Sequence, residues 1–282
     1  EWLVNHQGAE VIYIPVKRDG YIDLDFLKKV VAERGNEIAV ISIMHSNNEL
    51  GSIQPISQVV EIAGDIPVHT DAVQSFGKVE FNFDSLGVSA ATISAHKLGG
   101  PLGVAALVLT HGIDLAPLLH GGGQEREIRS GTINAPGIVA FARAAEIAIS
   151  NREENFNKIR VLRDQLISGI KSAVPDAIFN SPNDPALPGV VNISIPGTES
   201  DALLLLLDSE GISASAGSAC SAGVPRPSHV LVAMGIPEEL ADASLRISIG
   251  ATNTSSEIDQ VISVLPSVVE RARNAFAVGK SS

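Results

Sequence analysis

Residues 38–71 read IAVISIMHSNNELGSIQPISQVVEIAGDIPVHTD, and this stretch decides the fold. It begins with a continuous apolar run at 38–43, passes through a helical pattern at 55–63 and returns to a strand pattern at 67–70. Continuous apolar strands that alternate with helices are typical of a parallel sheet covered on both faces, because a strand buried on both sides shows no polar alternation. The stretch therefore predicts an α/β architecture, with a mostly parallel sheet and helices on both faces.

The same alternation extends through the first half of the chain. Asp23 is a good cap for a helix that ends near Gly35. Further strands are predicted at residues 11–14, 90–94 and 104–109. We expect these elements to form a large domain over residues 1–150.

After residue 131 the pattern changes. Pro136 suits a first helical turn, and it predicts a helix that runs to about residue 149. Shorter elements with Pro- and Gly-rich joints follow, with helices expected at 151–172, 200–209 and 256–275 and strands at 190–195 and near Ile212. They predict a small C-terminal α+β domain over residues 151–282.

Composition excludes several classes of function. The 282 residues carry a formal net charge of −12, which disfavours binding to nucleic acid or anionic lipid by a basic surface. No apolar run approaches the roughly 20 residues that span a bilayer, and the first residues do not resemble a signal peptide. We expect a cytoplasmic protein. The single cysteine, Cys220, excludes an internal disulfide framework and a multi-cysteine metal site, so no metal is expected.

Three clusters follow predicted strands, at the edge where open α/β sheets bind ligands, and two of them are polar. In HTDAVQ (69–74), Asp71 can face the pyridine nitrogen of pyridoxal phosphate (PLP), and Gln74 can reach the ring hydroxyl. A plain helix cap by Asp71 is the competing interpretation. In SAHK (94–97), Lys97 can form a Schiff base, and Ser94 and His96 can donate to a phosphate. A solvated loop lysine is the alternative there.

The third cluster surrounds Cys220. It lies within a run of small residues, 213–223, that has little apolar side chain to bury. Such a segment is predicted to be mobile and its thiol accessible, which favours a reactive cysteine over a buried structural one.

Together these motifs resemble the class V aminotransferase group of fold-type I PLP enzymes, and within it the cysteine desulfurases of the IscS/NifS type. The resemblance covers nearly the whole chain. The segments that carry it, in order, are HSNNELG (45–51), HTDAVQ (69–74), SAHK (94–97), GGGQER (121–126), RSGT (129–132), GSAC (217–220) and SLRIS (244–248).

The resemblance implies a reaction and further roles. L-cysteine would be converted to L-alanine, with Lys97 as the PLP lysine and a persulfide formed on Cys220. Asn48 would contact the substrate or the ring hydroxyl, and Arg246 would clamp the substrate carboxylate, which its planar guanidinium suits. Thr132 would reach the phosphate in a partner subunit, which implies a homodimer. The persulfide would pass to an acceptor such as an iron–sulfur scaffold protein or a thiolation pathway.

Family members also carry an N-terminal portion before the point that matches Glu1, with a phosphate-binding turn and a histidine that stacks on the ring. Neither feature is located in this sequence. Two alternatives therefore stay open. One is a selenocysteine lyase or another class V PLP enzyme, and the other is a truncated or degenerate scaffold without catalysis.

Overall fold

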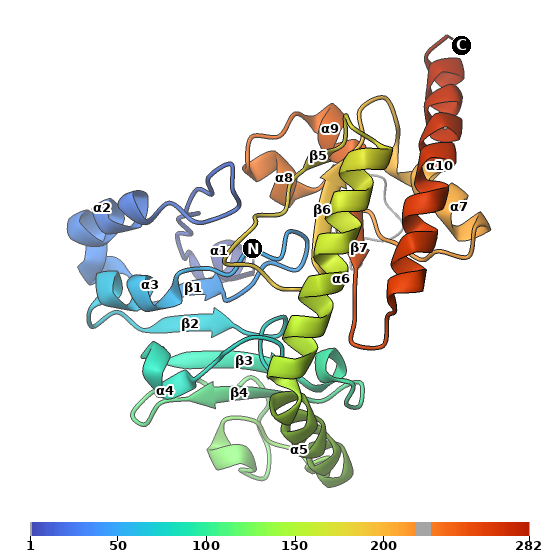
Figure 1. Cartoon of the computed structure of the whole chain (residues 1–282). Coiled ribbons are helices and arrows are strands. Elements are labelled where there is room, and N and C mark those ends of the chain that lie inside the picture. The colour runs from blue at the N-terminus through green and yellow to red at the C-terminus, as the bar shows by residue number, and fades with distance from the viewer. Residues whose placement is uncertain (1, 218–226, 282) are drawn as a thin grey trace.

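The computed structural model describes residues 2–217 and 227–281. Its first half holds a four-stranded sheet in the order β1-β2-β3-β4 (Figure 1). Strands β1 to β3 are parallel and β4 is antiparallel to β3. The strands are β1 (Ile41–Met44), β2 (Val68–Asp71), β3 (Ala90–Ser94) and β4 (Ala105–Leu109).

Helices cover this sheet because the apolar side chains of their inner faces pack against it. Leu27, Ile56 and Val59 share one core with Ile41 and Ile43 of β1. The helices of this half are α1 (Trp2–Gln7), α2 (Leu24–Arg34), α3 (Ile56–Ala63), α4 (Phe83–Leu86) and α5 (Ala135–Ser150), and the 3₁₀ helices are η1 (Gly35–Glu37), η2 (Ala95–Leu98) and η3 (Glu125–Glu127). As predicted, the Asp23 side chain caps α2, because it accepts from the backbone N–H groups of Asp25 and Phe26.

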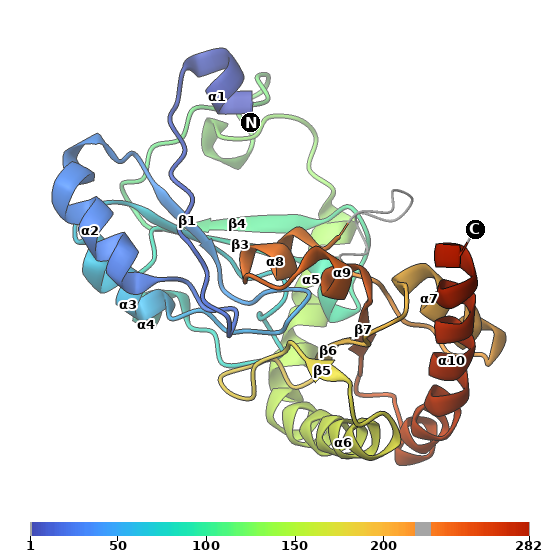
Figure 2. The ribbon, with the colours of Figure 1, turned by 90° about the horizontal axis from the view of Figure 1, so that it is seen from above.

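The second half is built on a three-stranded antiparallel sheet in the order β5-β6-β7. The long helices α6 and α10 lie side by side over it (Figure 2). The strands are β5 (Ile178–Phe179), β6 (Val190–Ser194) and β7 (Ser244–Ser248), and the helices are α6 (Arg152–Ala173), α7 (Ser200–Ser209), α8 (His229–Ala233), α9 (Glu238–Asp242) and α10 (Ser255–Ser281).

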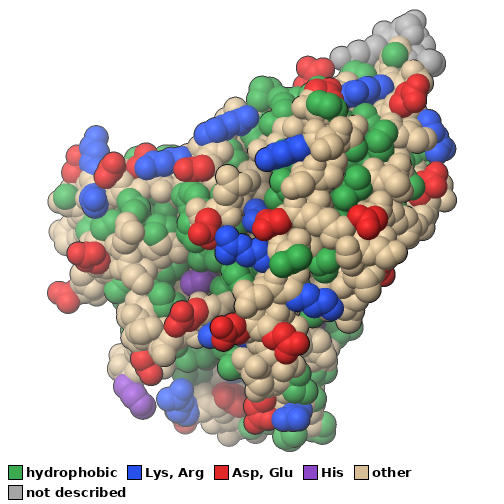
Figure 3. All heavy atoms as spheres, viewed as in Figure 1, with side chains coloured by type: hydrophobic (Ala, Val, Ile, Leu, Met, Phe, Trp, Pro, Cys, Tyr) green, Lys and Arg blue, Asp and Glu red, His purple; other side chains and the backbone are tan. Residues whose placement is uncertain are grey.

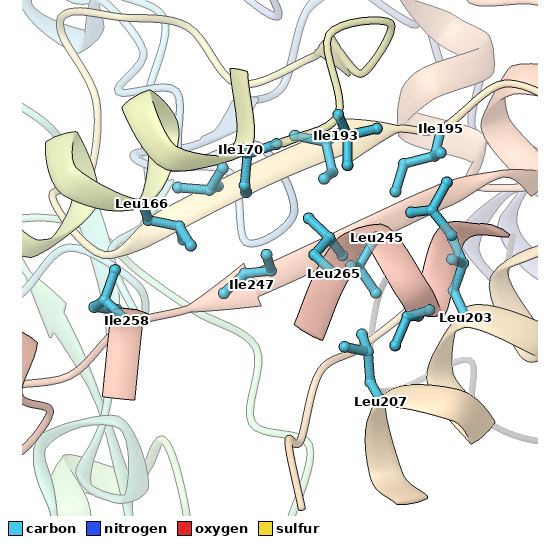
Figure 4. Packing of buried hydrophobic residues seen from close by; sticks show 14 of the residues in the cluster. Leu166, Ile170, Ile193, Ile195, Leu203, Leu207, Leu245, Ile247, Ile258 and Leu265 are labelled. Atoms are coloured by element: carbon cyan, nitrogen blue, oxygen red, sulfur yellow. The ribbon is translucent and has the colours of Figure 1, made fainter. Parts of the chain in front are cut away.

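This sheet carries a large apolar core. Leu166 and Ile170 of α6 meet Ile193 of β6, Leu245 of β7 and Leu265 of α10, all of them fully buried (Figure 4). The period-two alternation of Leu245 and Ile247 with polar neighbours explains why β7 is a strand with one inner face.

Two sequence predictions of local structure are wrong. Residues 11–14 form no strand, and Tyr13 is strongly exposed, so the apolar run has no sheet to join. The segment near Ile212 also forms no strand; Ser215 makes only an isolated bridge with Arg246. The division into domains at residues 1–150 and 151–282 stays a prediction.

Candidate active site

The carboxyl ends of three parallel strands meet at one edge of the first sheet. Met44 of β1 pairs with Asp71 of β2, and Asp71 pairs with Thr92 of β3. The backbone continues this pairing beyond the strands, since His45 N–H donates to the Asp71 carbonyl oxygen over 2.7 Å. The segments that contain Asn48, Gln74 and Lys97 therefore leave the sheet at the same edge, as predicted from the sequence for Gln74 and Lys97.

Asp71 ends β2 with a partly buried carboxylate. Its Oδ1 accepts the backbone N–H of Val73 over 2.9 Å, which fixes the side chain by a local Asx-type turn. Among the described residues its Oδ2 has no hydrogen-bond donor. The carboxylate is thus held at one oxygen and open at the other, an arrangement that suits a protonated nitrogen of a ligand.

Lys97 lies on η2, directly after β3, and is exposed. In the same segment, the Ser94 hydroxyl and His96 Nδ1 are 2.7 Å apart. Gly99 takes a left-handed φ of 78° and closes the turn, which only glycine does without strain. The turn therefore presents a hydroxyl, an imidazole and an amine together.

Arg246 joins the second sheet to this edge. It lies on β7, yet its Nη1 donates to the backbone carbonyl of Asn48 over 3.1 Å. The two residues are 198 positions apart in the chain. The fold therefore brings together the two residues that the sequence assigned to the substrate.

Two histidines near the strands have structural partners. His69 lies between β1 and β3, with Nδ1 2.8 Å from the Ser42 hydroxyl and Nε2 2.9 Å from the Thr92 hydroxyl. Burial lowers the pKa of His69, and the nearby Asp71 charge offsets part of that effect. Burial also lowers the pKa of His45, whose ring packs edge-on against Phe81. A neutral imidazole fits the contacts of both histidines.

Sequence reasoning missed two ionisable side chains. Glu49 is only 1% exposed, and its Oε2 accepts the Ser228 hydroxyl over 2.5 Å. Lys78 donates from Nζ to Gln74 Oε1 over 3.2 Å. Burial, with a smaller repulsion from Lys97, lowers the pKa of Lys78 to about 8. Their positions in the sequence could have indicated both residues, since each lies within four residues of a predicted site residue.

The structure leaves Thr132 outside this cluster and does not describe Cys220. Thr132 is exposed in the segment before α5. Cys220 lies outside the described residues.

The polar side chains at this edge of the sheet fit PLP. Asp71 offers a carboxylate oxygen for a pyridinium, Gln74 an amide for a ring hydroxyl, Ser94 and His96 polar atoms for a phosphate, and Lys97 an amine for an aldehyde. No three His, Cys, Asp or Glu side chains of residues 2–217 and 227–281 gather as a metal site.

Other surface features do not compete with this edge. A hollow lined by Val4, Asn5 and Tyr13 contains none of the candidate side chains. On the face viewed in Figure 3, acidic and basic side chains are interspersed among hydrophobic ones. None of the helices in the described part of the chain is long and apolar enough to span a membrane.

Comparisons with known proteins show the family of this chain. The profile of the family described as Aminotransferase class-V matches residues 1–261. An IscS-like cysteine desulfurase of Mycobacterium tuberculosis is 43% identical over 97% of this chain and 70% of its own length. The cysteine desulfurase IscS of Methanosarcina thermophila is 42% identical over 97% of this chain and 67% of its own length.

A solved structure gives the same result for the fold. The NifS-like protein of Rickettsia africae superposes with a TM-score of 0.87 at 34% identity, over 95% of this chain and 72% of that one. The chain thus spans about 70% of the length of these relatives. It belongs to the class V aminotransferase family, and within it to the PLP-dependent cysteine desulfurases of the IscS/NifS type.

Proposed function

We propose that this protein converts L-cysteine to L-alanine and transfers the sulfur to Cys220. The observation that carries the proposal is the meeting of Asp71, Gln74 and Lys97 at one sheet edge, where Arg246 also reaches Asn48. The names of its relatives support the substrate.

PLP, when bound, supplies an electron sink for the pair left on the substrate Cα after proton removal. Asp71 would hold a proton on the pyridine nitrogen through its open oxygen. Gln74 would donate to the ring hydroxyl, while Ser94 and His96 would donate to the phosphate. Lys97, which is exposed on η2, would hold the aldehyde carbon through Nζ until the substrate amine displaces it.

The substrate is held by two residues. Arg246 binds the carboxylate with the two-pronged geometry of its guanidinium. Asn48 lies beside it and contributes its side-chain amide. With the substrate oriented in this way, the Lys97 amine that the substrate has displaced would remove the Cα proton as a general base.

The sulfur step balances without an external oxidant. The Cys220 thiolate attacks the substrate sulfur, a new S–S bond forms and the Cβ–S bond breaks. The substrate sulfur is oxidised to the level of a persulfide while Cβ is reduced to the methyl group of alanine. Cβ takes up one proton, which balances the proton that the Cys220 thiol loses on becoming a thiolate, and Cα regains the proton that Lys97 removed. An acceptor protein then removes the outer sulfur, and an iron–sulfur scaffold is the acceptor we propose.

The remaining parts of the proposal concern assembly. Thr132 is exposed, and we assign it to the phosphate of a partner subunit in a homodimer. The place of action is the cytoplasm.

Mass spectrometry after a single turnover with L-cysteine tests the proposal. We expect one added sulfur atom on the peptide that contains Cys220, together with one equivalent of alanine. The variant Cys220→Ser should form neither persulfide nor alanine at an appreciable rate. Full alanine release from Cys220→Ser would leave a class V PLP enzyme without a sulfur carrier at this position.

A further inference from the structure

Lys78 is a charged residue that the proposed reaction does not use. It ends the turn that follows β2, where Phe76 N–H donates to the Ala72 carbonyl and Lys78 N–H to the Ser75 carbonyl, both over 2.9 Å. The side chain is partly buried, and its Nζ is 3.2 Å from Gln74 Oε1. It therefore contacts a proposed cofactor ligand directly.

The chemistry of this contact fixes the orientation of an amide. A lysine ammonium has three donors and no acceptor, so it can bond only the oxygen of a glutamine side chain. With Oε1 turned to Lys78, Nε2 and its two N–H groups point the other way. Without such a partner, the two ends of an amide are nearly equivalent in shape and either can face a ligand.

The turn also lies against the helix that bears Lys97. Gly77 has a φ of 73°, and a Cβ at this position would come within 2.8 Å of Leu98 Cδ2 and 2.9 Å of Ala148 Cβ. This close approach holds Gln74 and Lys78 beside η2 and α5. Lys78 is near enough to Lys97 for the two charges to repel each other.

Partial burial of an ammonium disfavours the folded state, because the charge loses part of its hydration. A methionine of similar length would fill the same space without that penalty. Packing alone therefore does not account for a lysine here, whereas control of the Gln74 amide does.

We propose that Lys78 is a positioning residue, which turns the Gln74 amide so that Nε2 donates to the ring hydroxyl of PLP. The inference rests on the proposed function, since it takes Gln74 as a ligand of the ring. Lys78 acts through Gln74 and makes no contact with the substrate.

The test is a double-mutant cycle on the full protein, with PLP affinity and the visible absorption band of bound PLP as readouts. Lys78→Met should weaken PLP binding about tenfold and shift the band, because the ring hydroxyl loses an ordered donor. In a Gln74→Ala background the same change should alter the affinity less than about twofold. The melting temperature without PLP should stay the same or rise. Lys28→Met, which removes an exposed lysine paired with Asp25, is the matched control and should change neither readout.

Four results would overturn the inference. A tenfold loss that persists in the Gln74→Ala background would mean that Lys78 contacts the cofactor itself. A lower melting temperature with unchanged PLP affinity and spectrum would mean a structural role. A wild-type protein that binds no PLP would overturn the proposed function as well, whereas a wild type that binds PLP and is matched by Lys78→Met would sink the role of Lys78 alone.

Discussion

The antiparallel sheet and the carboxyl edge of the parallel sheet differ in what surrounds their side chains. The antiparallel sheet β5-β6-β7 packs one face into an apolar core, in which Leu166, Ile193 and Leu245 are completely buried between α6, α7 and α10. The edge of the parallel sheet instead carries Asp71, Gln74 and Lys97, all partly or fully exposed to solvent. We therefore expect substitutions in the core of the second sheet to change stability and substitutions at the edge of the first to change activity. Arg246 links the two sheets through Asn48.

The largest effect should come from the apolar core. On α7, Leu203 is fully buried while Leu205 is 72% exposed, so one helix provides both the test and its control. Leu203→Ala should lower the free energy of unfolding by about 3 kcal/mol, because it leaves a cavity that packed neighbours cannot fill. Leu205→Ala should change it by less than about 0.5 kcal/mol. Urea unfolding measures both, and equal losses would contradict the assignment of the core.

The partly buried amine of Lys78 should make the free energy of unfolding of the protein depend on pH. Its pKa is about 8 in the folded protein against 10.5 for an ordinary lysine. Between these values the unfolded chain binds more protons, so stability rises with pH there, and below pH 8 the penalty on the charged form is fully present. Without PLP, the free energy of unfolding of the wild type should rise by up to about 3 kcal/mol from pH 8 to 10.5, relative to that of Lys78→Met. Urea unfolding at a series of pH values measures this difference. Parallel pH curves of the two proteins would show that Lys78 keeps its ordinary pKa.

Asp71→Asn should separate chemistry from stability. An asparagine Oδ1 still accepts the Val73 N–H, so the melting temperature should stay within a few degrees of the wild type. Turnover should fall about a hundredfold, because a neutral amide does not hold the proton on the ring nitrogen. The control is Asp23→Asn, which keeps the cap of α2 and lies away from the sheet edge. Unchanged turnover in Asp71→Asn would reduce Asp71 to a turn residue.

Arg246→Lys, at the contact between the two sheets, should have a smaller effect on activity than Asp71→Asn. Lysine keeps the charge but loses the forked geometry, so KM for cysteine should rise about tenfold with little change in kcat. Arg271→Lys, on the exposed side of α10, should leave KM as it is. An unaltered KM in Arg246→Lys would move the carboxylate clamp to another residue.

Much of this site could be predicted from the sequence because it depends on local order along the chain. Asp71 and Lys97 each follow an apolar run, and parallel strands bring such positions to one edge. The contact of Arg246 with Asn48 could not be derived from spacing, since it depends on how β7 is placed against the first sheet. The predicted strand at residues 11–14 was wrong because apolar composition alone does not supply a neighbouring strand.

The partial burial of Lys78 and the full burial of Glu49 were also beyond the sequence. A lysine or a glutamate in a loop is usually solvated, and only the packing of the Gly77 turn against Leu98, or of Glu49 against Ser228, shows otherwise.

The identity of the cofactor lysine tests the account most directly, because Lys97 and Lys78 lie close together and only one is proposed to bind PLP. Borohydride reduction of the PLP-loaded protein, followed by peptide mapping, should place the pyridoxyl group on Lys97. Lys97→Ala should abolish the label, whereas Lys78→Met should keep it. A pyridoxyl group on Lys78, or a label that survives Lys97→Ala, would contradict the assignment of the active site.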